Sequence, residues 1–466
     1  MTRLFANLFI CQLIFLSFAS CDDILDVDLP GNILPREDVF DSPEAIKAAV
    51  NGMYAENFAV HRIYEYILPL YLSIAADESY HNLPNNYNYE ELRKNAYGPS
   101  NDYVGFLWSY PYASTLLSNG LIEGLSQTVV ISEEEKRHYT GEAKYFRAYN
   151  YFVLVNLFGD VPWVKSANIR ETALQPRESK EKIITEAEGI IDDLKFTETA
   201  LANSSNSNAY VTKAAASALL ARVYLYHEDW AEAEAKAGEV IGTSGYELET
   251  DLDNVFLRSS KETIFRSSSA AGQPSYVGRT YLAVVLLNAS YFRLTSDLVN
   301  SFEDEDLRKA KWLKNETTYF HPYKYKRNAA ASAGAAEDLV LLRLAEQYLI
   351  RAEARAQQNK LTGENGAIAD INVIRNRAGL SALPETLPKE QVLLAIENER
   401  RHELFVEEGH RWWDLVRTGR ADAVLGNKAK FPEKQWESYK ALFPVPEGEL
   451  TQNSNLTPNP GYGDIN

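Results

Sequence analysis

Paired segments with small or apolar residues at alternating steps of three and four recur along this chain and constrain its fold more than any other feature. Residues 213–241 and 339–378 each read as two helices joined by a short turn. In the second pair, Leu349, Ala352 and Ala356 share one helical face. Small residues at the contacts let helices approach closely, as tetratricopeptide-type stacking requires. The pattern therefore predicts a mostly all-α fold.

Two further pairs extend this scaffold. Ser132 and Glu135 form a capping box for a helix that ends at Gly159, and residues 180–195 are its expected partner. Residues 390–420 form the last pair. We expect about four tetratricopeptide-type helix pairs, although the consensus of that repeat is not matched letter by letter. The scaffold is expected over residues 133–241 and 339–420.

Two regions break the helical rhythm. Residues 78–106 are rich in Asn, Tyr and Pro, and residues 245–335 combine Ser/Ala/Gly stretches with scattered aromatics. Ala329–Ala336 is of low complexity and is predicted to be a mobile loop. Irregular segments on a rigid scaffold are where binding sites usually lie. Length alone suggests about three domains, but no linker separates a second body, so residues 21–466 are expected to form one domain.

The stretch 399–420 mixes charged residues with large aromatics. If Arg400, Arg401 and Arg411 are buried they need acidic partners, because an unpaired buried guanidinium is costly. The acids available are Glu403, Glu407 and Asp414. One interpretation is an ion-paired clasp between two short helices. The alternative is a catalytic group made of His402, Glu403 and His410.

The N-terminus has the features of an export signal. Arg3 supplies positive charge, and the apolar run after it is too short to span a membrane. We expect a lipoprotein signal peptide over residues 1–20 and lipid attachment at Cys21; an ordinary secretory signal is the alternative. Cys11 lies in the leader, so no thiol would remain for a disulfide or a thiolate metal site.

Composition narrows the kinds of ligand. The formal net charge of −18 argues against nucleic acid and anionic membrane patches, and it fits neutral ligands or simple solubility. Aromatic residues make up 12% of the chain, and 28 of them are tyrosines. A tyrosine offers a flat apolar face and a hydroxyl, which suits a sugar ring. Most of these tyrosines are nevertheless expected at helix–helix contacts.

Enzyme motifs are scarce. His402-Glu403 begins a zinc-protease motif, but Val406 stands where the second histidine is needed. Neither a Gly-x-Ser-x-Gly elbow nor a phosphate-binding Gly-Lys-Ser/Thr loop occurs. We expect no catalytic residue, no metal and no cofactor. A glycosidase needs only two carboxylates, so the 65 acidic residues leave that alternative open.

Several short motifs occur in the order in which they occur in the SusD/RagB family of surface glycan-binding lipoproteins of Bacteroidetes. They lie at residues 49–54, 141–148, 156–162, 343–346, 371–380 and 443–446, and the stretch 399–420 resembles the family's C-terminal signature. The resemblance implies a fold with four tetratricopeptide-type pairs. It also implies a SusC-like TonB-dependent transporter as partner, and a lipid-anchored position on the outer membrane, facing the cell exterior.

The resemblance and the loop aromatics together suggest where a ligand binds. Residues 77–82 resemble the place where family members begin their ligand-contacting loop, and residues 290–295 match a segment next to the binding surface. The candidates in the first region are Asp77, Tyr80, Asn82, Tyr87 and Tyr89, and those in the second are Tyr276, Tyr281, Tyr291, Arg293, Trp312 and Tyr319.

Three functions fit these features. The favoured one is capture of an oligosaccharide without catalysis, followed by its delivery to the transporter. The alternatives are a lipid-anchored glycan hydrolase and a helical-repeat scaffold that binds a peptide or protein. The loop tyrosines favour the first function over the third.

Overall fold

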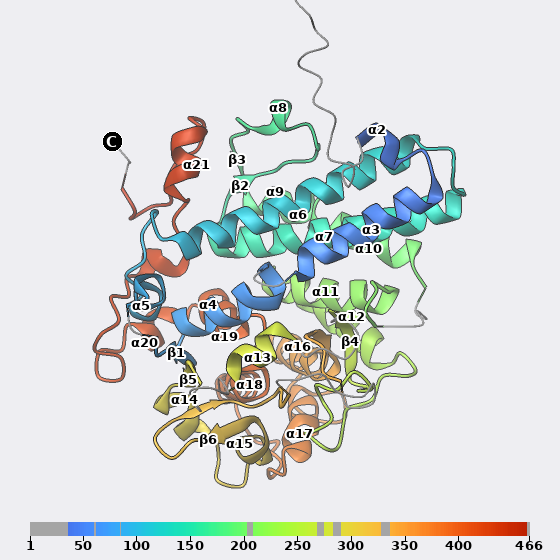
Figure 1. The fold of residues 1–466 in the computed structure, drawn as a ribbon. Helices are drawn as coiled ribbons and strands as arrows, with labels where there is room; N and C mark the ends of the chain where they lie inside the picture. The colour runs from blue at the N-terminus through green and yellow to red at the C-terminus, as the bar shows by residue number, and fades with distance from the viewer. Residues whose placement is uncertain are drawn as a thin grey trace, which may run out of the picture.

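Helices dominate the part of the chain that the structure describes (Figure 1). The computed structural model describes residues 36–59, 62–83, 85–202, 208–267, 275–282, 290–327 and 336–463. The expected leader at residues 1–20, the lipid site Cys21 and residues 329–335 of the expected loop lie outside these ranges.

Two long helices, α6 (Asp102–Gln127) and α7 (Glu133–Phe158), pack side by side near the N-terminus, and α3 (Pro43–Phe58) packs against α6 (Figure 1). The expected capping box of Ser132 and Glu135 is confirmed at the start of α7, where each residue bonds to the backbone of the other.

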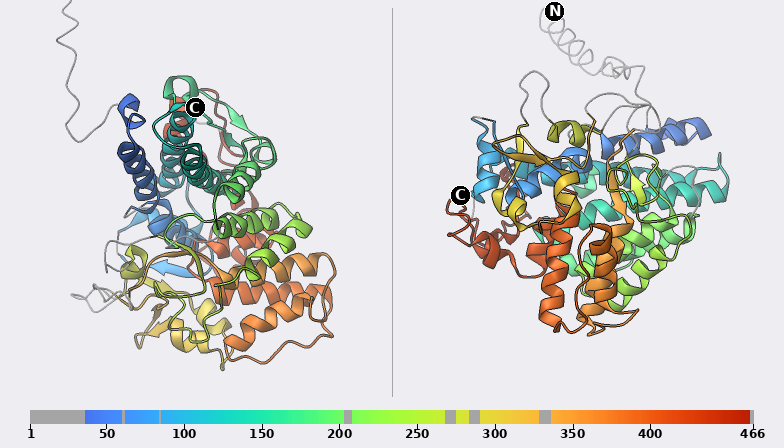
Figure 2. Two further views of the ribbon diagram at one scale, coloured as in Figure 1. Left: turned by 90° about the vertical axis from the view of Figure 1, so that its right-hand side faces the viewer. Right: turned by 90° about the horizontal axis from the view of Figure 1, so that it is seen from below.

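The expected helix pairs are confirmed. Figure 2 shows them following one another in chain order, from the teal helices to the orange and red ones. Helix α7 packs against α10, α11 against α12, α16 against α17, and α18 against α19; α10–α11 and α12–α16 contacts join successive pairs. The bounds are α10 Ile190–Ala200, α11 Lys213–Tyr226, α12 Trp230–Ile241, α16 Leu344–Gln357, α17 Ala367–Arg377, α18 Lys389–Leu404 and α19 His410–Arg417.

The partner expected at residues 180–195 is not one helix. It is divided into α9 (Lys180–Thr185) and the start of α10, with a break before Gly189. A β-carbon at Gly189 would lie 2.5 Å from the carbonyl oxygen of Ile183, so the chain bends where only glycine fits.

The two irregular regions contain more regular structure than expected. Within residues 78–106 lie α5 (Tyr87–Lys94) and the first turn of α6. Four two-stranded antiparallel sheets occur in the described ranges: β1 (Ser79–His81) with β5 (Phe292–Leu294), β2 (Val161–Pro162) with β3 (Arg177–Glu178), β4 (Thr263–Arg266) with β8 (Val340–Arg343), and β6 (Leu313–Asn315) with β7 (Phe320–Pro322).

Short helices complete the fold. In the second irregular region these are α13 (Tyr276–Tyr281), α14 (Ser296–Ser301) and α15 (Leu307–Trp312). Elsewhere they are α2 (Arg36–Val39), the π-helix η2 (Ile63–Ile67), α4 (Leu68–Ala75), α8 (Ile169–Thr172), α20 (Ala421–Leu425), the 3₁₀-helix η4 (Ser438–Ala441) and α21 (Glu447–Gln452).

Helices α18 and α19 form the expected ion-paired clasp, but of its three arginines only Arg400 pairs with an expected acid, whereas Arg401 and Arg411 both pair with Asp77. Nε of Arg400 donates to Asp414 over 2.7 Å, and Arg411 donates to Asp77 over 2.8 Å. The carboxylate of Glu403 is fully buried and accepts hydrogen bonds from Arg308 and Arg343. These pairs keep buried charges neutralised, as a buried guanidinium requires.

The catalytic alternative for this stretch is wrong. His402, Glu403 and His410 are all buried, and arginines enclose the carboxylate of Glu403. Burial and nearby arginines lower the pKa of His402 to about 3, and its Nε2 lies 2.9 Å from the hydroxyl of Ser301. A neutral histidine beside a saturated carboxylate cannot act as an acid–base pair on a substrate.

Candidate functional site

A short antiparallel ladder joins the two irregular regions. In it, Tyr80 of β1 lies opposite Arg293 of β5, and His81 lies opposite Phe292. The ladder continues past His81, where the backbone N–H of Asn82 donates to the carbonyl of Tyr291 over 2.8 Å. Residues far apart in the sequence therefore share one surface.

An open cavity of about 430 Å³ lies beside this ladder, and we call it the tyrosine pocket. Its lining comes from η2, β1, α5, α6, α13 and β5 with their adjoining turns. The lining residues are Tyr66, His81, Leu83, Asn86, Tyr89, Tyr103, Tyr276, Arg279, Thr280, Tyr291 and Phe292. Cavities of this size hold small ligands or a few sugar units.

The aromatic rings of the tyrosine pocket form one connected surface. The ring of His81 stacks on Tyr89 with centroids 4.1 Å apart, and Tyr103 meets Tyr89 edge-on at 4.7 Å. The hydroxyls of Tyr66 and Tyr89 lie 2.6 Å apart, and the Tyr66 ring contacts Tyr276 at 5.5 Å. These contacts fix the rings in place before any ligand arrives, which lowers the entropic cost of binding.

Polar groups at the edge of the tyrosine pocket are held by the same elements. Asn86 caps α5 by accepting from the N–H of Tyr89, and its amide donates to the hydroxyl of Tyr103 over 3.1 Å. The guanidinium of Arg279 lies over the ring of Tyr276, 5.4 Å from its centroid. The pocket therefore offers hydrogen-bonding groups around an aromatic floor, as sugar recognition requires.

A buried acid positions α13 at the pocket. Glu65 of η2 accepts a hydrogen bond from the backbone N–H of Tyr276 and another, over 3.1 Å, from the hydroxyl of Ser267. Burial raises the pKa of Glu65 to about 7. The same cause lowers the pKa of His81 to about 4 and raises that of Tyr66 to about 12, so both of these lining residues are neutral at pH 7.

The opposite face of the ladder carries a second aromatic group. Because side chains alternate along a strand, Tyr80 and Arg293 face away from His81 and Phe292. The guanidinium of Arg293 stacks on the ring of Tyr319, 3.9 Å from its centroid. The Tyr319 hydroxyl accepts from the backbone N–H of Ser290 over 3.1 Å, which holds this ring in place.

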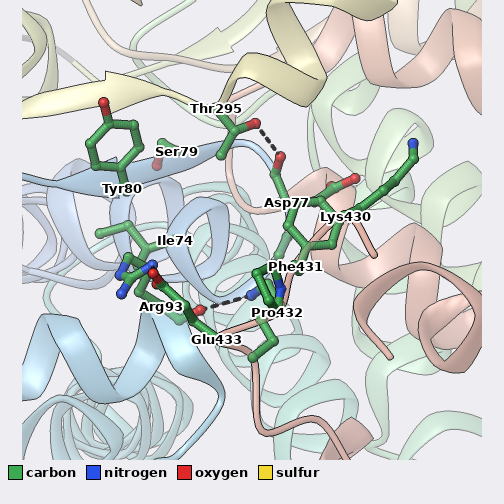
Figure 3. A pocket seen from close by; sticks show the side chains of 12 residues that line it. Ile74, Asp77, Ser79, Tyr80, Arg93, Thr295, Lys430, Phe431, Pro432 and Glu433 are labelled. Carbon is green, nitrogen blue, oxygen red and sulfur yellow. Dashed lines mark hydrogen bonds and ion pairs between the residues drawn. The ribbon is translucent and has the colours of Figure 1, made fainter. Parts of the chain in front are cut away.

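A smaller cavity of about 250 Å³ lies between β1 and residues 430–434 (Figure 3). Tyr80 and Arg93 line it, and Arg93 forms an ion pair with Glu433. Beneath it, the ammonium group of Lys434 donates to three backbone and side-chain oxygens. The charged groups of this cavity already have partners, so it offers a ligand less than the tyrosine pocket does.

Eight of the eleven sequence candidates lie at or near this surface. Tyr89, Tyr276 and Tyr291 line the tyrosine pocket, whereas Tyr80, Arg293 and Tyr319 lie on the other face of the ladder. Asn82 and Tyr87 are exposed beside the pocket without lining it, Asn82 just after β1 and Tyr87 at the start of α5.

The other three candidates have buried, already bonded side chains and do not line the tyrosine pocket, although Asp77 lines the smaller cavity. Trp312 is fully buried and its indole N–H donates to the carbonyl of Leu252. Tyr281 is buried with its hydroxyl near the carbonyl of Pro69. Asp77 is 1% exposed and neutralises Arg401 and Arg411, which hold its pKa well below its usual range despite burial.

Eight of the eleven lining residues were missed from the sequence: Tyr66, His81, Leu83, Asn86, Tyr103, Arg279, Thr280 and Phe292. Tyr103 falls in the region 78–106 that was expected to be irregular, but it lies on the first turn of α6, and Tyr66 lies on the π-helix η2. His81 directly follows the candidate Tyr80, so the alternation of side chains along a strand could have indicated it. Arg279 lies on the same short helix as the candidate Tyr276, and that helix was the signal available for it.

Two negative findings concern the described ranges alone. No helix within them combines the length and apolarity that crossing a membrane requires. Within the same ranges, no three or more His, Cys, Asp or Glu side chains are grouped so that they could hold a metal ion.

Comparison with known proteins finds that the chain is similar to SusD-like proteins. It is 28% identical to SusD-like protein P2 of Formosa agariphila, over 96% of this chain and 98% of that protein. A crystal structure of a SusD superfamily protein from Parabacteroides distasonis matches with a TM-score of 0.78 at 23% identity, covering 90% of this chain and 99% of the other.

A second solved structure has the same fold. Surface glycan-binding protein A from Bacteroides thetaiotaomicron, solved in complex with laminarihexaose, matches with a TM-score of 0.73 at 20% identity, covering 90% of this chain and 99% of the other. Two family models match in succession. The family described as starch-binding and associating with the outer membrane covers residues 23–225, and the SusD family covers residues 278–462. With these matches spread over most of its length, the chain belongs to the SusD/RagB family.

Proposed function

We propose that this protein binds an oligosaccharide in the tyrosine pocket without converting it, and passes it to a SusC-like TonB-dependent transporter in the outer membrane. The observation that carries the proposal is the pocket itself. Its connected rings offer flat apolar faces, and Asn86, Arg279 and Thr280 surround them with hydrogen-bonding groups. This combination suits the alternating apolar and hydroxylated surfaces of sugars.

The relatives support the same class of ligand. One matched family is described as starch-binding and associating with the outer membrane, and one structural neighbour was solved with laminarihexaose bound. Attachment through a lipid at Cys21 and a position facing the cell exterior belong to the proposal, since residues 1–35 lie outside the described ranges.

Capture without catalysis is favoured by the chemistry of the lining. None of the residues that line the tyrosine pocket is acidic, whereas glycoside hydrolysis commonly needs two carboxylates on either side of the bond. His81 cannot replace them as a general acid near pH 7, because burial lowers its pKa to about 4.

Calorimetric titration of the purified protein against a panel of oligosaccharides tests the proposal, with product formation followed in the same samples. We expect saturable binding without turnover. Replacing Tyr291 by Ala should weaken that binding about tenfold, the loss expected for one stacking partner. Tyr210→Ala removes a half-exposed tyrosine outside the pocket and is the matched control, with unchanged affinity. Turnover, or equal affinity of the Tyr291 variant and the control, would contradict the proposal.

A further inference from the structure

Arginines in this protein nearly always have an acidic partner, as expected for a chain with 65 acidic and 47 basic residues. Among the arginines whose side chains the structure describes, those without an ion pair are Arg137, Arg170, Arg177, Arg279, Arg293 and Arg327. Arg137 donates to Thr199, and Arg177 donates to backbone carbonyls, so both are otherwise occupied. Two of the remaining four lie at the candidate site.

Arg293 is held in a fixed plane with its donors unused. It lies on β5 between two buried residues, and the ring of Tyr319 supports its guanidinium at 3.9 Å. Its Nε is buried without a hydrogen-bond partner in the described structure, and its other two nitrogens donate no hydrogen bond there either. A guanidinium stacked on an aromatic ring presents a preorganised fork of donors that matches a carboxylate or a sulfate.

Arg279 presents a second unpaired charge within the tyrosine pocket. Its side chain is exposed, it lies over the ring of Tyr276, and no lining residue is acidic. The nearby acids are committed elsewhere. Glu65 binds the N–H of Tyr276, and the carboxylate of Glu316 lies 3.3 Å from His321.

The segments that flank these arginines contain no acidic residue. Residues 268–274 and 283–289, on either side of α13, contain neither Asp nor Glu. Neither the flanking segments nor the described structure therefore provides an acidic partner for Arg279 or Arg293. Leaving such cations beside an aromatic binding surface is useful when the ligand itself brings the negative charge.

We infer that the ligand is an acidic oligosaccharide, whose carboxylate or sulfate groups are bound by Arg279 in the tyrosine pocket and by Arg293 across the ladder. This inference rests on the proposed function. The net charge of −18 fits neutral ligands, but screening limits such long-range fields to about 8 Å at physiological salt. The local cations therefore decide which ligand is preferred.

The test compares polysaccharides that share a backbone and differ in charge. Binding of the purified protein is measured to polygalacturonate and its methyl ester, to a sulfated galactan and its desulfated form, and to neutral laminarin. We expect a charged form to bind at least about tenfold more tightly than its neutral counterpart, and to weaken as salt rises. The pair that shows the difference identifies carboxylate or sulfate as the group recognised.

Variants assign the effect to the two arginines. Arg279→Gln and Arg293→Gln should each weaken binding of the charged form about tenfold, with Arg293→Lys intermediate because it keeps charge without the fork. Arg170→Gln removes an exposed, unpaired arginine on α8, at the far end of the molecule from α13 and β5, and should change nothing (Figure 1).

The outcomes separate this inference from the proposed function. A neutral form bound as tightly as its charged counterpart, or charged binding unaffected in both glutamine variants, would overturn the inference and leave glycan binding in place. Absence of binding to every polysaccharide would overturn both.

Discussion

The clasp of α18 and α19 and the tyrosine pocket use the same residue types for opposite purposes. In the clasp, Glu403 is buried and accepts hydrogen bonds from the buried Arg308 and Arg343 of neighbouring elements. In the pocket, tyrosine rings line an open cavity, and Arg279 has no acidic partner in the described structure. Partnered and buried groups hold the fold, whereas preorganised groups without partners are available to a ligand.

This difference shows why residue type alone is a poor guide to function here. Asp77 and Trp312 have the chemistry of a sugar site, but the fold uses them to neutralise arginines and to fill the core. What distinguishes a binding residue is that part of its side chain lines an open cavity, and only the three-dimensional arrangement shows that.

The largest effect is expected from breaking the clasp. Replacing Glu403 by Gln leaves Arg308, Arg343 and Arg377 without a shared carboxylate in a buried setting. The free energy of unfolding should fall by about 3–5 kcal/mol in urea denaturation. Glu56→Gln, which breaks the partly exposed pair with Arg62, should change it by less than about 1 kcal/mol. Similar losses of unfolding free energy in both variants would contradict the difference between the buried clasp and a partly exposed ion pair.

A buried acid whose only basic neighbour in the described structure is a histidine with a lowered pKa should respond to pH in the opposite sense to Glu403 of the clasp. Burial raises the pKa of Glu142 from 4.5 to about 7, and its main partner is the hydroxyl of Tyr54 at 2.9 Å. Its folded form holds the proton more tightly, so its contribution to stability is full at low pH and is lost as pH rises towards 7.

The replacement of Glu142 by Gln removes this titration while keeping an oxygen for Tyr54. The unfolding free energy of the variant relative to wild type should therefore rise by about 2–3 kcal/mol between pH 5 and pH 8. Urea denaturation at the two pH values measures it. The same difference at both pH values would show that Glu142 is not protonated in the folded protein.

Replacing a tyrosine of the pocket is expected to have a smaller effect, and to change the affinity for oligosaccharide. Tyr276→Ala removes one ring that contacts Tyr66, and should weaken oligosaccharide binding about tenfold. Trp312→Ala should leave the affinity of the folded protein unchanged while lowering its unfolding free energy by about 3–5 kcal/mol. Titration calorimetry and urea denaturation on both variants measure the two effects. Weaker binding by the Trp312 variant together with unchanged binding by the Tyr276 variant would contradict the assignment.

The smallest effect tests a residue that serves both purposes. Asn86 caps α5 and also donates to Tyr103 in the pocket. Asn86→Ala should lower the unfolding free energy by about 1 kcal/mol. Asn86→Asp keeps the cap and should restore most of that loss in the same denaturation assay; no recovery would show that capping is not the cause.

Local sequence patterns were sufficient to predict most helices of the scaffold. The capping box at Ser132 and the small residues around Ala352 predicted helices that the structure contains, because both signals depend on neighbours in sequence. The expected helix over 180–195 was wrong at Gly189, where a close backbone contact overrides the apolar periodicity.

The site was only partly predictable, because it depends on pairing across the chain. Tyr276 and Tyr291 were found as aromatics of an irregular region, and for Tyr291 also from the family resemblance, but the ladder that brings His81 beside Phe292 has no local signature. The main errors arose because the sequence does not show which candidate side chains are buried. Tyr281 and Tyr291 look alike in sequence, yet one packs inside the core and the other lines the pocket.

A crystal structure of the protein with its tightest-binding oligosaccharide tests the central claim most directly. The account predicts a sugar ring stacked in the tyrosine pocket, in contact with Tyr276 or Tyr291, and an anionic group near Arg279 or Arg293. A sugar bound elsewhere, with the tyrosine pocket unoccupied, would contradict it.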